Sequence, residues 1–171
     1  MKVKVDLVPG AQWSDGTPIS CADLEATWKF VMDKDNTGLA TGTTGYEDIT
    51  SIDGGTTSSC TLNFSKIYEN YLGLFGPLLP AKYLATSSVT DAINKLYTND
   101  APEKGVYSGP YIPTKWAAGA QTDMKANPKY WDTIKKSKAP FDTVTFRYFA
   151  DTAALIAGFK NGEVDVALEF N

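Results

Sequence analysis

Short apolar segments of two different periodicities follow one another along the whole chain, and this alternation limits the folds that it can adopt. Apolar and polar side chains alternate over residues 2–8, which predicts a half-buried strand. The loop 9–18 is rich in turn-forming residues and leads to Ser20, which is expected to cap a helix over 21–33. That helix carries apolar side chains at helical spacing, namely Leu24, Trp28, Val31 and Met32. The chain therefore begins as a mixed structure of strands and helices.

A hairpin and two short helices are predicted in the middle of the chain. Residues 46–53 and 57–64 flank the turn-forming sequence Asp53-Gly54-Gly55, which is typical of a β-hairpin. Short helices are expected over 67–75 and 81–97, separated by a segment that contains two prolines.

Strand patterns dominate beyond Gly109. Three strands are predicted, over 111–116, 122–126 and 143–149. A helix capped by Asp151 or Thr152 follows and ends at Asn161-Gly162. The apolar run 164–168 has the length of a strand buried on both faces. The strand–helix–strand order predicts a βαβ unit whose first strand is 144–149.

Composition excludes most catalytic and metal-binding chemistry. The chain has no histidine and only two cysteines, which removes Ser-His-Asp and Cys-His catalysis, histidine-based metal sites and structural zinc. The acidic pairs that could serve a glycosidase, Glu163 with Asp165 and Glu47 with Asp48, each lie within one segment, so their two carboxylates do not face each other across a substrate. Lysines are scattered and Arg147 is the only arginine, which disfavours nucleic acid as a partner. No enzyme activity, metal or cofactor is therefore expected.

Tryptophans and cysteines leave alternatives open. The tryptophans could stack on a sugar or peptide, but a place in the core is favoured for Trp13, Trp28, Trp116 and Trp131. Cys60 shares a predicted strand face with Leu62 and Phe64, and Cys21 opens the first helix. Two buried free thiols and one disulfide are equally compatible with these positions.

Three motifs occur in one order along nearly the whole chain. They are the run Trp13 to Ser20 with Thr27-Trp28 after it, the run Gly109 to Tyr111 with Trp116 and Asn127 to Trp131 after it, and the run Asn161 to Asp165. Together they resemble the family-5 extracellular solute-binding proteins, which are the oligopeptide-, dipeptide- and nickel-binding subunits of ABC importers. Most of these residues have folding roles, so the motifs identify the scaffold more than the ligand.

The resemblance implies an α/β fold similar to the type II periplasmic binding proteins. Residues 1–107 would be a small α+β domain, and residues 108–171 would be part of the core of lobe I, to which the small domain is attached. Members of this family are several times longer, so the second lobe would be absent and the chain would be a fragment.

The same resemblance implies the substrate-binding component of an ABC importer. Two lobes would close on a peptide or similar small solute and deliver it to permease subunits in the full-length protein. The location would be extracytoplasmic, in the periplasm or at the cell surface, with membrane contact only through a lipid anchor or the permease. The alternative is a surface adhesion or interaction module on the same scaffold.

The resemblance also suggests ligand-binding residues and a disulfide. Candidates at the end of the chain are Leu168, Glu169, Phe170 and Asn171, and candidates in a loop of the small domain are Thr41, Thr43 and Tyr46. Cys21 stands where alanine is usual, and Cys60 lies in a strand that normally has no cysteine. Two such departures in one presumed domain favour a Cys21–Cys60 disulfide.

Overall fold

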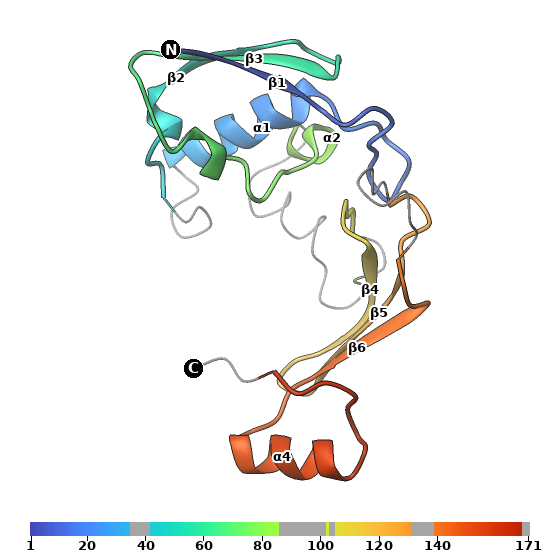
Figure 1. Ribbon diagram of the computed structural model, residues 1–171. Helices are drawn as coiled ribbons and strands as arrows, with labels where there is room; N and C mark the ends of the chain where they lie inside the picture. The colour runs from blue at the N-terminus through green and yellow to red at the C-terminus, as the bar shows by residue number, and fades with distance from the viewer. Residues whose placement is uncertain (35–41, 86–101, 103–104, 131–138, 169–171) are drawn as a thin grey trace.

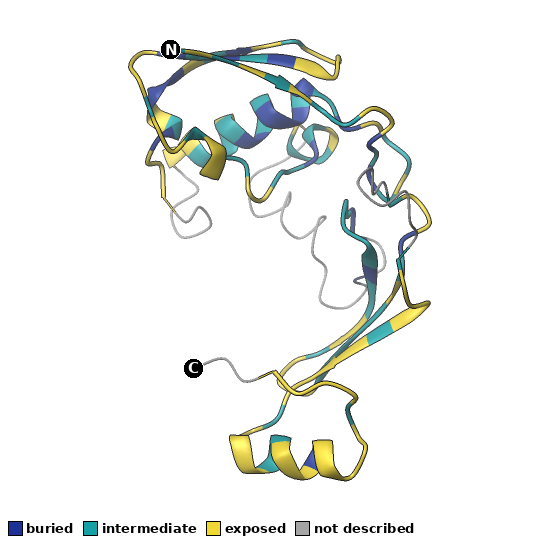
Figure 2. Ribbon diagram, viewed as in Figure 1, coloured by how far each residue is buried: buried dark blue, intermediate teal, exposed yellow. Residues whose placement is uncertain are grey.

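The computed structural model describes residues 1–34, 42–85, 102, 105–130 and 139–168. The molecule is C-shaped and contains two three-stranded sheets: the first lies with its helices at one end, and the second runs along the side of the C to the last helix at the other end (Figure 1). Burial is concentrated around the first sheet, whereas the last helix and much of β6 (Thr143–Arg147) are exposed (Figure 2). We call the first sheet with its helices the first part, and the second sheet with the last helix the second part. The first part encloses a core, and the second part presents most of its surface to solvent.

The first sheet has the strand order β1-β3-β2 and is wholly antiparallel. Its strands are β1 (Lys2–Asp6), β2 (Ile49–Asp53) and β3 (Ser59–Phe64). Leu62, in the central strand, pairs with Val3 on one side and Ile52 on the other. The predicted hairpin is confirmed, except that residues 46–48 form a 3-10 turn before β2.

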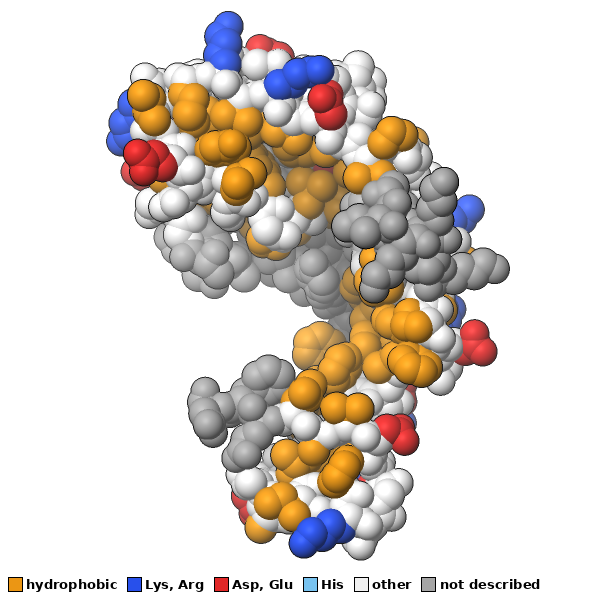
Figure 3. Space-filling view, in the orientation of Figure 1, with side chains coloured by type: hydrophobic (Ala, Val, Ile, Leu, Met, Phe, Trp, Pro, Cys, Tyr) orange, Lys and Arg blue, Asp and Glu red, His pale blue; other side chains and the backbone are white. Residues whose placement is uncertain are grey.

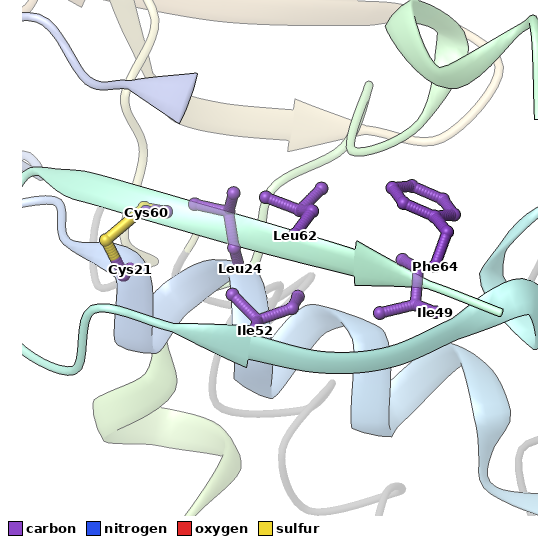
Figure 4. Close-up of a cluster of buried hydrophobic side chains, with 7 residues drawn as sticks. All are labelled: Cys21, Leu24, Ile49, Ile52, Cys60, Leu62 and Phe64. Carbon is purple, nitrogen blue, oxygen red and sulfur yellow. A yellow bond between two sulfur atoms is a disulfide. The ribbon is translucent and has the colours of Figure 1, made fainter. Parts of the chain in front are cut away.

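Helix α1 (Cys21–Met32) packs on the first sheet and closes its core (Figure 4). Alternate side chains of β3 are buried, as the period of a strand requires. They meet apolar side chains of α1 and β2 in one cluster that contains Cys21, Leu24, Ile49, Ile52, Cys60, Leu62 and Phe64. Cys21 and Cys60 are joined in a disulfide across this cluster, with their Cα atoms 5.5 Å apart.

The buried carboxylate of Asp23 fixes the start of two helices. Its Oδ2 accepts a 2.7 Å hydrogen bond from the backbone N–H of Ser20, as expected for an acidic capping box. Its Oδ1 accepts a 2.8 Å bond from the backbone N–H of Ala81, the first residue of α2 (Ala81–Leu84). Asp23 is only 4% exposed, so its two bonds tie α1 and α2 together inside the fold.

A second core cluster joins the loop after β1 to the segment that leads into the second part. Trp13, Ile19 and Val106 are buried together. Beside them, the backbone N–H of Ser14 donates to the Tyr107 carbonyl at 2.7 Å, and the Tyr107 N–H donates to Ser14 Oγ at 3.0 Å. The chain up to Tyr107 is thus held against the first part before it enters the second sheet.

The second sheet has the antiparallel order β4-β5-β6. Its strands are β4 (Tyr111–Ala117), β5 (Gln121–Ala126) and β6 (Thr143–Arg147), followed by α4 (Thr152–Lys160). Asp151 caps α4, because its Oδ1 accepts a 2.8 Å bond from the Ala154 N–H. The Phe149 ring packs against Gly158, where a Cβ atom would lie 2.7 Å from it. Four predicted elements of this part are therefore confirmed.

Three sequence predictions differ from the structure. The segment 164–168 is not a strand, so the predicted βαβ unit does not form. A strand needs a neighbour for its backbone groups, and no described strand pairs with this one. The expected helix 67–75 is only a 3-10 turn, η3 (Tyr71–Gly73). The helix expected over 81–97 begins at Ala81 as predicted, in α2 (Ala81–Leu84), and residues 86–97 lie outside the described residues.

Candidate functional site

The molecule is hollowed between its two parts (Figure 3). One side of the hollow belongs to the part built on the first sheet, and the other side belongs to the part that carries α4. A concave surface between two structural units is where small-molecule sites most often occur. A site of this kind would take its residues from both parts.

Tyr46 is an anchor of the first part. Its hydroxyl accepts a 2.6 Å hydrogen bond from the Phe75 N–H, and the two rings meet edge to face at 5.2 Å. Its backbone carbonyl accepts a 3.0 Å bond from Trp28 Nε1. The hydroxyl, the ring and the backbone carbonyl of Tyr46 thus already have partners within the first part. A ligand could contact only the exposed fraction of its half-buried side chain.

Thr43 lies at the surface, three residues before Tyr46. Its hydroxyl donates to Glu47 Oε2 at 3.4 Å, and both side chains are exposed. Thr41, the third candidate of this loop, falls outside the described residues. Thr43 is thus the candidate of this loop that is free to meet a solute from solvent.

The candidates at the end of the chain belong to the second part. Leu168 is 59% exposed, which is a high value for a large apolar side chain. Glu169, Phe170 and Asn171 lie outside the described residues. Among the described residues, no hydrophobic cluster or hydrogen bond brings Leu168 together with Thr43 or Tyr46. The three described candidates, Thr43, Tyr46 and Leu168, are therefore divided between the two parts, and no described contact joins them in one pocket.

A small cavity lies in the first part, beside the loop that follows β1. Its volume is about 90 Å³, and Trp13, Asp15, Lys82 and Tyr83 contribute to its lining. Pockets that enclose small-molecule ligands usually measure about 300–1,000 Å³. This cavity is therefore too small for a peptide.

The charged groups beside that cavity have a structural role. Lys82 Nζ lies 3.3 Å from Asp15 Oδ2, and the Thr17 N–H donates to Asp15 Oδ1 at 2.9 Å. Burial opposes the charged form of Asp15, but the bonds from Thr17 and the Lys82 ammonium outweigh it and lower the pKa of this carboxyl. A carboxylate held in its charged form in this way fixes the loop to α2 and is a poor proton acceptor.

Surface ion pairs and hydrogen bonds explain the other perturbed groups. The Thr145 hydroxyl and the Gln121 amide lower the pKa of Asp123, and the hydrogen bond to Asp48 raises the pKa of Lys66. Within the part of the chain that the structure describes, no three acidic or cysteine side chains gather as a metal-binding group. No described helix is long and apolar enough to cross a bilayer.

An exposed aromatic surface on the second sheet was not predicted as a functional feature. Trp116, which was expected in the core, is 51% exposed, whereas Trp13 is buried as expected. Phe146, in β6, and Tyr148, just after it, are also exposed, at 48% and 52%. The alternation of apolar and polar residues in β5 and β6 signals such a face, but it does not say what covers it.

Comparison with known proteins gives one consistent result over the whole chain. The sequence profile of the bacterial extracellular solute-binding proteins, family 5 Middle, matches residues 1–171. The oligopeptide-binding protein OppA of Mycobacterium tuberculosis is 30% identical in an alignment 162 residues long, which covers 92% of this chain and 26% of OppA.

Two solved structures have the same fold. The periplasmic EDTA-binding protein EppA is 27% identical, with a TM-score of 0.80 over 96% of this chain and 30% of EppA. The oligopeptide-binding protein AppA of Bacillus subtilis, solved with a nonapeptide, is 22% identical, with a TM-score of 0.76 over 95% of this chain and 31% of AppA. The chain thus spans between a quarter and a third of each of these three proteins.

Proposed function

The chain belongs to family 5 of the bacterial extracellular solute-binding proteins, and on that premise we propose that it is one part of a longer receptor that binds a peptide or similar small solute for an ABC importer. We call that longer protein the receptor. The observation that carries the proposal is the match of family and fold over nearly the entire chain. A role in binding rather than catalysis agrees with the sequence, which lacks histidine.

Peptides are the solute class that the relatives favour. OppA is named for oligopeptides, and AppA was solved with a nonapeptide. EppA is named for EDTA, which like a peptide is a flexible molecule that carries carboxylate groups. We propose a peptide as the first ligand to test and a carboxylate-rich chelate as the second.

The two parts of the chain would have different tasks in the receptor. We propose that residues 1–107 form the small domain and residues 108–171 form part of lobe I, with the second lobe supplied by the remainder of the receptor. The ligand would lie in the hollow, near Thr43 of the small domain and near the segment that starts at Leu168. Closure of the second lobe on the ligand would be a hinge motion that the ligand favours by contacting both lobes.

The proposed location is outside the cytoplasm, held by a lipid anchor or by the permease. A disulfide between two buried cysteines supports this location, because such bonds persist in oxidising compartments.

A ligand screen on the receptor tests the proposed function. Purified receptor is heated with single peptides of two to nine residues, with nickel chelates and with sugars, and the unfolding temperature is recorded. A ligand at 100 times its Kd adds roughly 2.7 kcal/mol of stability, which such a scan detects. We expect at least one peptide to raise the unfolding temperature, and a Leu168→Arg receptor to lose that rise, whereas Lys115→Ala, on the second sheet, should keep it. A receptor that no peptide stabilises would refute peptide binding.

A further inference from the structure

The only disulfide of the chain is closed to solvent. Cys21 and Cys60 are its only two cysteines, and both are 0% exposed in the structure. Figure 4 shows the bond at one end of the buried cluster, between α1 and β3. A disulfide is formed or broken when a thiolate attacks a sulfur, so one of the two sulfur atoms must be within reach of the reagent. In the folded chain neither sulfur is within reach.

The hairpin turn between β2 and β3 covers the sulfur of Cys21. The Cys21 N–H donates to the Thr57 carbonyl at 2.9 Å, and Cys21 Sγ lies 3.9 Å from Thr57 Oγ1. At Gly54, in the same turn, the position of an added Cβ atom is 2.6 Å from Cys21 Sγ. The space beside this sulfur is therefore too small for a methyl group, and much too small for a thiol reagent. A reagent can reach it only after the start of α1 separates from the turn.

Several buried contacts oppose that separation. The Asp23 carboxylate, two residues along α1, accepts bonds from the Ser20 N–H at 2.7 Å and from the Ala81 N–H at 2.8 Å. Leu24, which is 4% exposed, packs in the same cluster as the disulfide. Separation of α1 from the turn therefore breaks its tie to α2 and exposes core side chains. Such an opening is rare in a folded protein, and its frequency limits the rate at which a buried group reacts.

The formation of the bond meets the same obstacle. Oxidation of the two thiols passes two electrons and two protons to an oxidant, whose own disulfide becomes two thiols. The exchange proceeds through a mixed disulfide, in which one cysteine of the chain is bonded to a sulfur of the oxidant. The lack of space between Cys21 Sγ and Gly54 excludes this intermediate from the closed core. Cys60, at 0% exposure, is no more accessible.

We propose that disulfide exchange reaches Cys21 and Cys60 only while the core of the first part is open. A disulfide-bearing oxidant then has to act on the chain before α1 packs on the sheet, and the finished bond is closed to reductants until α1 separates again. Oxidation thus precedes the packing of α1. This inference rests on the proposed function only for the oxidising location of the receptor, and it involves no ligand.

An order-of-addition experiment tests when oxidation occurs. The 171-residue chain is reduced in urea and diluted into buffer, and oxidised glutathione is either present from the start or added after refolding. Tryptophan fluorescence follows the refolding. Glutathione is a small probe, so a sulfur that it cannot reach is also closed to a protein oxidant. We expect oxidation to be slower by about tenfold or more when glutathione is added after refolding.

The outcomes of this experiment separate the two orders of events. A refolded reduced chain that glutathione oxidises as fast as the unfolded reduced chain would overturn the proposal. A reduced chain that stays unfolded until it is oxidised would support it, because oxidation would then come first. Neither outcome depends on ligand, so a receptor that binds no peptide would refute only the proposed function.

Matched variants test the reverse reaction. Asp23→Ala and Asp151→Ala each remove a carboxylate that caps a helix, the first beside the disulfide and the second at α4. Each oxidised chain is incubated in buffer with dithiothreitol, and the thiols formed are alkylated and counted by mass spectrometry. We expect Asp23→Ala to speed reduction about tenfold, because α1 separates more often, and Asp151→Ala to change it less than about twofold. Equal effects of the two variants would contradict the proposal.

The wild type gives a measurement that needs no variant. Its disulfide should resist dithiothreitol in buffer, where the core is closed, and be reduced at once in urea, where the core is open. Equally fast reduction in buffer and in urea would show that the sulfurs are accessible in the folded chain, and would refute the proposal.

Discussion

A disulfide and a buried carboxylate fix the start of α1 to the rest of the first part. The Cys21–Cys60 disulfide is fully buried and joins the first residue of α1 to β3. The backbone N–H of Cys21 also donates to the Thr57 carbonyl at 2.9 Å, so the helix start is fixed to the hairpin twice. Its neighbour Asp23 adds the buried bonds to Ser20 and Ala81 described above. These contacts all lie at the N-terminal end of α1, which is therefore fixed by a covalent bond and several hydrogen bonds.

Removal of the disulfide should destabilise the first part strongly. The bond closes a loop between residues 39 positions apart, which corresponds to roughly 3–4 kcal/mol of lost chain entropy in the unfolded state. We expect the Cys21→Ala/Cys60→Ala variant to lose about this much free energy of unfolding in urea, followed by tryptophan fluorescence. When the wild type is treated with a thiol reductant under partly denaturing conditions, its free energy of unfolding should fall toward that of the variant. An unchanged urea midpoint would show that the bond adds nothing to stability.

The hairpin between β2 and β3 shows how an element depends on a neighbour. Gly54 has a positive φ of 137° and lies against the disulfide, where an added Cβ would be 2.6 Å from Cys21 Sγ and 2.8 Å from the Ser59 carbonyl oxygen. Gly55 also has a positive φ, of 56°, but its Cβ position is open. The turn therefore needs glycine at position 54 for its backbone conformation and for lack of space, and at position 55 for its backbone conformation alone.

Alanine substitutions separate these two requirements. Gly54→Ala should cost about 2 kcal/mol or more, because it combines backbone strain with a clash against the disulfide and backbone. Gly55→Ala, the matched control, should cost about 1 kcal/mol, since it adds strain only. Urea unfolding of both variants measures the difference. Equal losses would mean that the space beside Cys21 is not limiting.

The sequence predicted those elements whose signals are local. The strand 2–8, the hairpin, the helix that starts after Ser20 and the helix that starts after Asp151 follow from alternation, turn residues and caps. The segment 164–168 was predicted wrongly as a strand because pairing depends on another segment, which a local pattern does not contain. Trp116 was misplaced for a related reason. Its pattern assigns it to an apolar face but does not reveal whether a second layer covers that face.

At the scale of the whole molecule, the motifs predicted the family and the fold but left the site incomplete. The match to the family profile confirms the resemblance drawn from residues 13–28, 109–131 and 161–165. The proposed ligand residues lie in two parts of the chain and are not gathered into one pocket, so Thr43 and Leu168 stay predictions. Residues that come together only around a ligand, or at a domain boundary, can be far apart in the sequence, so they form no motif of fixed spacing. The described structure fits a chain that supplies some of the ligand contacts, with the rest supplied by the receptor.

The most direct test of this account is a paired calorimetric titration with one peptide that stabilises the receptor. The same peptide is titrated into the receptor and into the 171-residue chain at matched concentrations. Because closure requires contacts from both lobes, we expect micromolar or tighter binding to the receptor and no measurable heat with the chain alone. Micromolar binding to the chain alone would contradict the account, because residues 1–171 would then contain a complete site.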